Sequence, residues 1–351
     1  MKPIRIGLIG FANSHQKDWL EHFHRHPGIE VVAISDHSPF GTYGGEEHAR
    51  RLGVDYHQDY RDLLKRRDVD VVSICSETTL HAEQTIAACQ AGKHIFYDKP
   101  FADTLENARA IVEAVQSAGV KFFMGLHLRL DPVFRRVRQL LADGMLGSIH
   151  HIDLIGEWGR SATIHTPWIH NPAAAGGGAL INFGVHGLDL VRYWTGDEVT
   201  EVYAELGQRT YPEYPVEDTA VVQMLLCGGA TVALIAGWGK PVERYSHAYD
   251  ARVEVRGQHG TLRANFSSAQ HLEVCSETVP YDRTTWITVG GYQDIRAEAV
   301  DMFVTYMDGE GPPLASLEDG YRNTELVEAA YRAARQHQPV TLPLPEWNLL
   351  W

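Results

Sequence analysis

Residues 4–15 read IRIGLIGFANSH, a mainly apolar run that ends at a glycine and passes directly into residues that begin helices. The run Ile4–Ile9 predicts a short parallel strand that is buried on both faces, because it shows no apolar/polar alternation. Gly10 supplies the tight turn, and Asn13 or Ser14 supplies a side-chain oxygen that caps the next helix. A strand, a turn and a helix in this order predict the first unit of a doubly wound α/β domain.

The same alternation of strands and helices continues as far as Met124. Each strand-like run is short and apolar, and the segments between them carry apolar residues at helical spacing. We expect strands at Ile29–Ser35, Val54–Tyr56, Asp70–Cys75, His94–Tyr97 and Lys121–Met124, and helices at Ser14–His26, Glu46–Leu52, Asp59–Leu64, Leu80–Ala91 and Thr104–Ala118. Because parallel strands joined by helices require right-handed crossovers, residues 1–124 are predicted to form a Rossmann-type parallel sheet.

Residues 125–351 have a different rhythm, with longer strand-like stretches and fewer helices. Several stretches alternate apolar and polar residues, which is typical of an antiparallel sheet. We expect strands at Ile149–Glu157, Val199–Gln208, Ala220–Leu226, Ala230–Gly237, Ala251–Arg256, Thr261–Phe266 and His271–Ser276, and helices at Pro132–Gly144, Leu180–Trp194, Asp294–Asp308 and Leu317–Gln336. The second domain is therefore predicted to be α+β with an open, mostly antiparallel sheet. A wide sheet face predicts a homo-oligomer, a dimer or a tetramer, in which another copy covers it.

The charge balance restricts the partners. The 351 residues include 31 Lys and Arg against 45 Asp and Glu, which gives a formal net charge of −14. This sign disfavours nucleic acid and anionic lipid, which are both polyanions, and favours a small-molecule ligand. No stretch approaches the ~20 apolar residues that a membrane span needs, and the N-terminus lacks the apolar core of a signal peptide.

Cysteine and histidine usage predicts a reducing compartment and no metal centre. The four cysteines are scattered without a C-x-x-C pair, and Cys75 and Cys227 lie in apolar runs, so we expect free thiols in the cytoplasm. His22 and His26 share a helix face, but no cysteine or carboxylate completes a ligand set beside them. We therefore expect no bound metal.

The turn at Gly10 is a candidate phosphate site. Backbone amides and the helix dipole favour an anion such as a pyrophosphate at this place, where Phe11, Ala12 and Asn13 form the turn. The pattern G-x-G-x-x-G is degraded, because Ala12 and His15 occupy its second and third glycine positions. A doubly wound fold that binds no nucleotide is the alternative.

Asp36 favours a nucleotide, and NAD in particular. It follows the second strand at about the distance from Gly10 at which an acidic side chain receives the ribose hydroxyls of a dinucleotide. Its charge repels a 2′-phosphate, so NAD is predicted over NADP. The alternative is that Asp36 only caps the next turn.

Short segments along the whole chain resemble one known family. They read CSETTLH at residues 75–81, AGKH at 91–94, DKP at 98–100, GLHLRLDP at 125–132, GGGALINFGVHGLD at 176–189, SLEDG at 316–320 and PVTLP at 339–343. In this order they resemble the Gfo/Idh/MocA oxidoreductases, the family of glucose–fructose oxidoreductase and inositol dehydrogenase. The resemblance covers essentially the whole chain and is far more specific than any one motif.

The chain departs from the family pattern at several positions. Asp98 stands in place of a glutamate, His127 in place of a common asparagine, and Asn182 in place of an aspartate. Glu77 and Thr78 stand where proline and asparagine are usual. Some sugar-nucleotide dehydrogenases of the family also carry asparagine at the position of Asn182, so activity is still expected.

The resemblance implies which groups react. Oxidation of a secondary alcohol needs a base for the hydroxyl proton while hydride leaves for the nicotinamide. By resemblance, Lys99 stabilises negative charge at the reacting carbon, His186 is the acid/base, and Asn182 orients the substrate or the imidazole. The expected cofactor contacts are Gly10, Phe11, Ala12, Asn13, Asp36, Ser76, Thr78, His81, Asp98, Lys99 and His127.

Other interpretations of these residues stay open. Lys99 is otherwise an ordinary solvated lysine, and His186 a core histidine satisfied by Asp189 or by the backbone. The glycines at 176–178 bring the chain close to the nicotinamide, or they form a flexible hinge.

Four residues besides Asn182 are candidate substrate contacts. Trp168 matches a family aromatic residue and either stacks on a sugar ring or packs in the core. His165 and His170 precede the glycine run and are expected to line the pocket. Arg129 either anchors a substrate oxygen or joins the ion pairs of the linker.

These residues predict an NAD-dependent dehydrogenase that acts on a secondary hydroxyl of a sugar, a cyclitol or a sugar derivative. Two alternatives remain. One is an NAD-retaining enzyme that cleaves glycosides by oxidation, elimination and reduction. The other is a non-catalytic sensor on the same scaffold, which Ala12, His15 and Asn182 would support.

Overall fold

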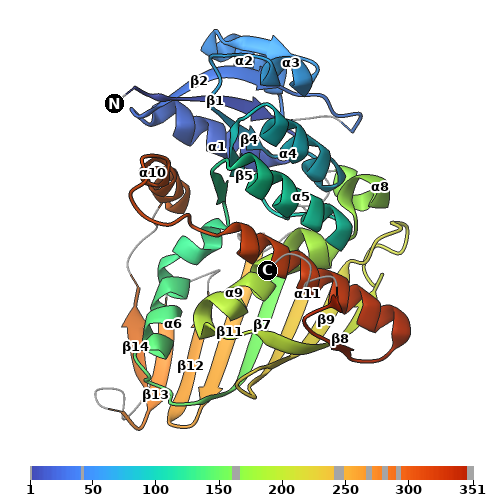
Figure 1. Ribbon diagram of the computed structural model, residues 1–351. Coiled ribbons are helices and arrows are strands. Elements are labelled where there is room, and N and C mark those ends of the chain that lie inside the picture. The colour runs from blue at the N-terminus through green and yellow to red at the C-terminus, as the bar shows by residue number, and fades with distance from the viewer. Residues whose placement is uncertain are drawn as a thin grey trace.

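In the computed structural model, which describes residues 2–40, 43–159, 167–240, 249–265, 271–278, 284–289 and 294–345, the first domain is built on a six-stranded sheet (Figure 1). Its order is β3-β2-β1-β4-β5-β6, and all neighbours are parallel. The strands are β1 (Ile4–Ile9), β2 (Ile29–Ser35), β3 (Asp55–His57), β4 (Val71–Ile74), β5 (His94–Tyr97) and β6 (Phe122–Met124). The predicted Rossmann-type parallel sheet is confirmed.

Several helices of this domain begin or end at capping residues that the sequence shows. They are α1 (Ser14–Arg25), α2 (Gly45–Leu52), α3 (Tyr60–Leu64), α4 (His81–Gln90) and α5 (Leu105–Ala118). The Asn13 side chain accepts a hydrogen bond from the His15 amide and begins α1, whereas Gly119 ends α5 in the left-handed conformation.

The second domain contains a nine-stranded sheet whose order is β14-β13-β12-β11-β7-β10-β9-β8-β15. Its strands are β7 (Ile149–Gly159), β8 (Val199–Gly207), β9 (Thr219–Leu226), β10 (Thr231–Lys240), β11 (Tyr249–Gly257), β12 (Gly260–Asn265), β13 (His271–Ser276), β14 (Thr285–Thr288) and β15 (Val340–Thr341). Only β7 and β10 pair in parallel among these described strands. The predicted open, mostly antiparallel sheet is therefore confirmed.

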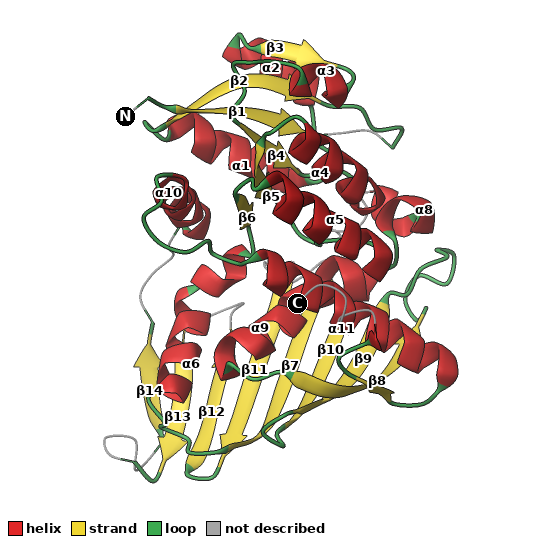
Figure 2. Ribbon diagram, viewed as in Figure 1, coloured by secondary structure: helices red, strands yellow, loops and turns green. Residues whose placement is uncertain are grey.

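Helices cover one face of this sheet. Figure 2 shows α6 (Pro132–Ala142), α9 (Val185–Thr195) and α11 (Leu317–Gln336) lying across it. The predicted helix Leu180–Trp194 is divided in two, because a π-helical turn, η4 (Leu180–Gly184), precedes α9. On the opposite face, Val221 and Leu225 of β9 are each 38% exposed, while their neighbours along the strand are buried.

Helix α10 (Ile295–Met307) returns to the first domain, although it follows the last strands of the large sheet. Its Phe303 ring lies 5.2 Å from the ring of Phe96 and 5.5 Å from that of Phe123. Together with α1, α10 therefore covers one face of the six-stranded sheet, while α4 and α5 cover the other. The domain boundary at residue 124 stays a prediction. In the structure, α10 also packs on the first domain, although it comes late in the chain.

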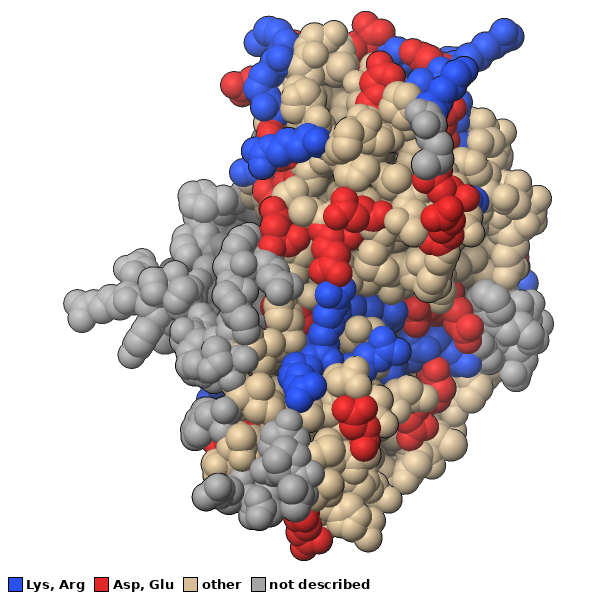
Figure 3. All heavy atoms as spheres, turned by 90° about the vertical axis from the view of Figure 1, so that its left-hand side faces the viewer, with Lys and Arg blue, Asp and Glu red and all other residues tan. Residues whose placement is uncertain are grey.

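The net negative charge is unevenly distributed. On the side of the molecule that carries α1, α6 and α10, a band of Lys and Arg lies beneath a cluster of Asp and Glu (Figure 3). Arg135 of α6 pairs with Glu298 of α10 at 2.6 Å, so opposite charges meet across elements there.

Within the described ranges, no helix combines the length and the hydropathy that crossing a bilayer requires.

Candidate active site

The turn after β1 packs directly against the end of β4. Gly10 has φ +81°, and a Cβ atom there would lie 2.1 Å from Ser76 Oγ, so only glycine fits this position. Ser76 Oγ donates a hydrogen bond to Gln84, and Trp168 of the second domain donates one to the Ala12 carbonyl at 2.8 Å. Two domains therefore meet over the turn that begins α1.

Asp36 lies beside this turn. Its carboxylate accepts hydrogen bonds from the Phe11 amide at 3.0 Å and from the Gly45 amide, the first residue of α2, at 3.1 Å. The side chain thus caps a helix, as one sequence-based alternative states. A carboxylate has about four acceptor positions, so two remain for ribose hydroxyls, and both interpretations fit the same geometry.

A hydrogen bond joins the two domains between Lys99, which follows β5, and Asn182, which lies within η4. Lys99 is 2% exposed, and its Nζ donates a hydrogen bond to the Asn182 carbonyl oxygen at 2.7 Å. Burial lowers the pKa of Lys99, although the neighbouring Asp98 carboxylate opposes this shift. The Asn182 side-chain Oδ1 is buried and has no hydrogen-bond partner among the described residues. A buried acceptor without a protein partner, beside a buried amine, can accept a hydrogen bond from a ligand hydroxyl.

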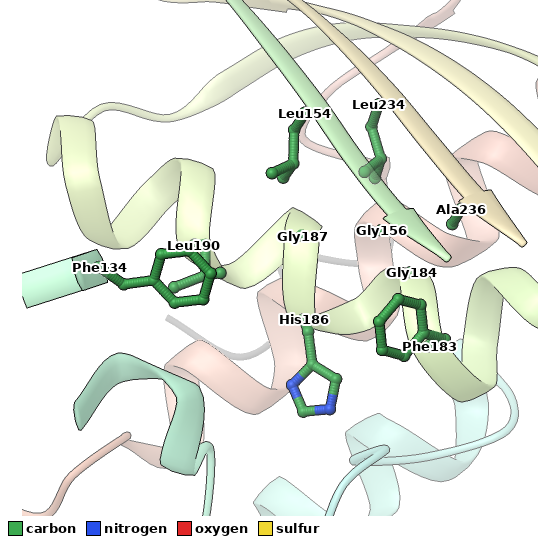
Figure 4. Close-up of a pocket in the computed structure, with 10 residues that line it drawn as sticks. All are labelled: Phe134, Leu154, Gly156, Phe183, Gly184, His186, Gly187, Leu190, Leu234 and Ala236. Atoms are coloured by element: carbon green, nitrogen blue, oxygen red, sulfur yellow. The ribbon is translucent and has the colours of Figure 1, made fainter. Parts of the chain in front are cut away.

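His186 lies one helical turn beyond Asn182. Burial, followed by the positive charge of Lys99, holds the pKa of His186 well below its usual value, so the imidazole is neutral at neutral pH. Figure 4 shows its ring pointing away from Leu154 and Leu234 on the sheet. A Cβ atom at Gly187 would lie 2.7 Å from Leu234, so the glycine lets α9 pack tightly on the sheet while His186 faces the first domain.

Asp98 receives hydrogen bonds from the first domain itself. His15 Nδ1 lies 3.0 Å from one carboxylate oxygen, and Trp19 Nε1 donates to the other at 3.1 Å. Burial raises the pKa of Asp98, but His15, Lys99 and Trp19 outweigh this effect and hold it well below the usual range. Asp98 is therefore an anion that accepts hydrogen bonds from His15 and Trp19, and its contact with the cofactor stays a prediction.

His81 and Thr78 support the loop after β4. The two His81 ring nitrogens lie 3.1 Å from the Ser76 carbonyl and 2.9 Å from the Pro100 carbonyl. Thr78 is buried and begins the short turn that precedes α4. His81 therefore holds two backbone segments of the site together, and a direct cofactor contact from either residue stays a prediction.

Arg129 takes part in a buried ion-pair network. Its guanidinium donates to both Asp189 oxygens, at 2.6 and 2.9 Å, and lies 3.1 Å from Asp319. Burial raises the pKa of Asp319, but Arg129 and Ser316 outweigh it, and the value falls to about 2. Of the two roles expected for Arg129, the geometry supports ion pairing rather than a substrate contact, because its donors already face protein carboxylates and the Leu314 carbonyl.

Replacing Arg129 should therefore act on stability. We expect Arg129→Met to lower the free energy of unfolding by about 3–5 kcal/mol at pH 7, because it leaves Asp189 buried without its cation. The depressed pKa of Asp319 contributes stability above its ordinary value of 3.8, and this contribution disappears as the pH falls toward about 2, so the loss should shrink in acid. Denaturant unfolding measures the free energy of unfolding of the variant. Arg135→Met, which breaks a half-exposed ion pair with Glu298, is the control and should cost much less. Equal losses in both variants would contradict the assignment.

Aromatic side chains gather on the second-domain side of the turn. The His170 ring stacks on Tyr214 at 3.8 Å and meets Trp238 at 5.4 Å. Trp168 and Trp238 are almost fully buried in the same cluster, and Trp238 Nε1 has no hydrogen-bond partner among the described residues. The structure thus places Trp168 and His170 in one wall beside Ala12. His165, also a candidate, lies outside the described residues.

Glu217 was not expected from the sequence. Its partly buried carboxylate accepts hydrogen bonds from the amides of Gly178, at 2.9 Å, and Leu180, at 3.0 Å, and from the Tyr331 hydroxyl. A Cβ atom at Gly178 would lie 1.9 Å from the Glu217 carbonyl oxygen. The glycine run therefore packs against Glu217 and fixes the start of η4. In the sequence, an isolated Glu before a strand gives no signal of this role.

No group of three or more metal-binding side chains occurs in the part of the chain that the structure describes. His22 and His26 instead approach Asp294 and Asp301 at 3.4 and 3.2 Å. These contacts give both histidines a structural partner.

Two family models match the chain over most of its length. Residues 4–126 match the oxidoreductase family with an NAD-binding Rossmann fold, and residues 134–263 match the GFO/IDH/MocA C-terminal domain. The chain is 27% identical to myo-inositol 2-dehydrogenase of Thermotoga maritima, over 84% of this chain and 87% of that one. It is 26% identical to scyllo-inositol 2-dehydrogenase (NAD(+)) of Bacillus subtilis, over 90% of each.

A solved structure agrees with these matches. An oxidoreductase domain protein from Kribbella flavida is 26% identical and superposes with a TM-score of 0.83, over 98% of this chain and all of that one. The Rossmann-type domain and the open sheet agree with the two family models, which describe an NAD-binding oxidoreductase. The chain belongs to the Gfo/Idh/MocA family. It is an NAD-binding oxidoreductase of that family.

Proposed function

We propose that this protein oxidises a secondary hydroxyl of a sugar, a cyclitol or a sugar derivative with NAD as the hydride acceptor. The observation that carries this proposal is the bond from Lys99 to the Asn182 carbonyl, which places a buried amine and His186 at one point between the domains. The names of the inositol dehydrogenases among the relatives support this substrate class. Formation of NADH on a panel of inositols and sugars tests it.

The residues of the first domain fit NAD. Gly10 makes the tight turn against Ser76 that leads into α1, and the dipole of α1 favours an anion such as a pyrophosphate at this helix end. Bound there, NAD would supply the acceptor for the hydride. Asp36 would hold the ribose hydroxyls, and Lys99 would lie at the carboxyl end of the sheet, where open α/β sheets hold ligands.

Three residues are proposed to act on the substrate: Lys99, Asn182 and His186. Neutral His186 accepts the hydroxyl proton, which its lowered pKa permits at neutral pH. Lys99 donates a hydrogen bond to the substrate oxygen and stabilises its developing negative charge. Asn182 Oδ1, which lacks a partner among the described residues, accepts a hydrogen bond from a neighbouring hydroxyl and orients the ring. Contacts of Trp168 and His170 with the sugar stay proposals, because both side chains are almost completely buried among protein groups.

Selection of NAD over NADP is proposed to rest on two carboxylates. Asp36 directly follows β2. Ser38, two residues after Asp36, donates a hydrogen bond to the buried carboxylate of Glu77. We expect wild type to bind NAD more tightly than NADP, and Asp36→Asn to weaken NAD binding by about tenfold to a hundredfold, the usual cost of losing hydrogen bonds to a charged group. Calorimetry measures both constants, with Glu30→Gln on the exposed side of β2 as the control. Tighter binding of NADP by the wild type would contradict the proposal.

A homo-oligomer, either a dimer or a tetramer, is also proposed. The support is the outward face of β9, where Val221 and Leu225 are the large apolar residues that the described part of the chain exposes on the large sheet. Covering this face would remove apolar surface from water. Light scattering at micromolar concentration should give a multiple of the 39.3 kDa chain mass, and a monomer would contradict the proposal.

A reducing, cytoplasmic location is proposed from the thiols. Cys75 and Cys89 are free and buried, and burial raises the pKa of the Cys75 thiol well above its usual value. Buried, protonated thiols of this kind are typical of proteins in a reducing compartment.

A further inference from the structure

Glu217 lies at the start of the helical segment formed by η4 and α9 and accepts hydrogen bonds from successive amides there. Its carboxylate accepts from the Gly178 amide at 2.9 Å and from the Leu180 amide at 3.0 Å. Its main-chain carbonyl accepts from the amide between these two, that of Ala179, at 2.8 Å. Because the first amides of a helix have no acceptor within the helix, Glu217 supplies acceptors that the start of this segment needs.

The glycines at 176–178, which precede η4, pack against other parts of the chain. A Cβ atom at the first glycine would collide with Asp103, one at the second with the Tyr331 hydroxyl, and one at the third with the main chain of Glu217. Close packing therefore explains why this run carries no side chains. Since each glycine is held by a neighbour, the geometry favours a fixed segment over a flexible hinge.

Two further hydrogen bonds connect Glu217 to Lys99. The Gly178 carbonyl accepts the Asn182 amide at 3.0 Å, and the Asn182 carbonyl accepts the Lys99 ammonium at 2.7 Å. A single residue, Gly178, thus lies between the Glu217 carboxylate and Asn182. A displacement of Gly178 would move both the carbonyl that Lys99 contacts and the Asn182 side chain that is proposed to contact the substrate.

The contacts of Glu217 require a group that only accepts hydrogen bonds. One carboxylate oxygen faces the Gly178 amide, and the other faces the Leu180 amide and the Tyr331 hydroxyl, which lies 2.8 Å away. In Glu217→Gln, the side chain has the same shape, but its NH2 group must point toward one of the two amides. That amide would lose its acceptor, so the variant removes a hydrogen bond without removing volume.

We propose that Glu217 is a positioning residue for the reaction, because it fixes the start of η4 and so holds Asn182 against Lys99. This inference rests on the proposed roles of Asn182 and Lys99. Glu217 acts through Gly178 and takes no part in bond making or breaking. Its loss should slow the chemical step more than it weakens NAD binding, because NAD is proposed to bind to the first domain.

The kinetic test uses Glu217→Gln. We expect kcat to fall by about tenfold to a hundredfold, the scale for small displacements of reacting groups, and the Kd for NAD to change by less than about twofold. The matched control is Glu325→Gln, because the buried Glu325 carboxylate of α11 also accepts a main-chain amide, that of Leu344, at 2.8 Å. The control should lower the free energy of unfolding by a comparable amount and leave kcat unchanged.

A second measurement does not require turnover. Acetic anhydride labels lysine amines, and mass spectrometry gives the labelling rate of Lys99 relative to that of Lys93, a buried lysine that bonds to carbonyls of the first domain. Glu217→Gln should raise this ratio by about threefold to tenfold, the cost of weakening one hydrogen bond. A general loss of stability would raise both labelling rates together, so Glu325→Gln should leave the ratio unchanged.

If Glu217→Gln does not fold, Tyr331→Phe serves in its place, because it removes one donor to the carboxylate and should act in the same direction. The inference is overturned if kcat or the labelling ratio is unchanged in the variant, or if Glu325→Gln changes both to the same extent. A wild type that oxidises no alcohol would contradict the proposed function alone. The labelling ratio would then still decide whether Glu217 holds Asn182 against Lys99.

Discussion

The variant His186→Ala is expected to lose about 10²- to 10⁴-fold in kcat, the usual scale for removing a general base. The loss follows from the position of the imidazole, which points away from the sheet and is close enough to Lys99 for that charge to lower its pKa. Binding of NAD should be unchanged within about twofold, because His186 lies on α9 of the second domain. Steady-state kinetics and calorimetry on the same preparation measure the two effects.

The pH dependence separates a base from a structural histidine. Because the pKa of His186 is lowered, the neutral base predominates at neutral pH, and kcat/KM should fall only in acid as the ring becomes protonated. In Asn182→Asp, the new carboxylate raises the pKa, so this fall should begin at higher pH. The matched control is His22→Ala, which should keep the wild-type rate. A wild-type rate in His186→Ala would show that the proton acceptor lies elsewhere.

Lys99→Met should lower kcat by a similar factor, about 10²- to 10³-fold, because it removes the donor that stabilises negative charge on the substrate oxygen. The variant also loses the bond to the Asn182 carbonyl, so a modest fall in stability is expected with it. Kinetics at saturating NAD, together with denaturant unfolding, distinguish the two consequences.

A second buried lysine provides the control. Lys93 is 8% exposed, and its Nζ donates to the Arg66 and Val69 carbonyls in the first domain, away from the domain junction. Lys93→Met should lower stability by a comparable amount and leave kcat unchanged. If both lysine variants lose activity in proportion to stability, Lys99 has no role in the transition state.

The first domain was predictable from the sequence because its signals are local. Apolar runs, capping residues such as Asn13 and glycines such as Gly119 mark where elements begin and end, and parallel order follows from the alternation. The return of α10 to this domain was not predictable. In the sequence, Phe303 is an ordinary apolar residue of a helix. Its contact with Phe96 is evident only in the folded structure.

The site was predictable only in part. The fold brings Lys99, Asn182 and His186 together, as the resemblance implied, although their roles remain proposals. Arg129 had two open roles, and only its distances to Asp189 and Asp319 distinguish them.

The structural roles of Glu77, Glu217 and His15 could not be found in advance. Each depends on contacts between residues that are distant in the sequence, such as Ser38 with Glu77 or His15 with Asp98. A lone His or Glu in a sequence does not reveal its neighbours.

Formation of NADH from NAD and a panel of inositols, free sugars and glycosides tests the central claim most directly. We expect at least one polyol to be oxidised with one NADH formed per hydroxyl oxidised, and this signal should be lost in His186→Ala. The contradicting result would be a folded protein that binds NAD but forms no NADH with any polyol, or one that releases sugar from a glycoside without net NADH.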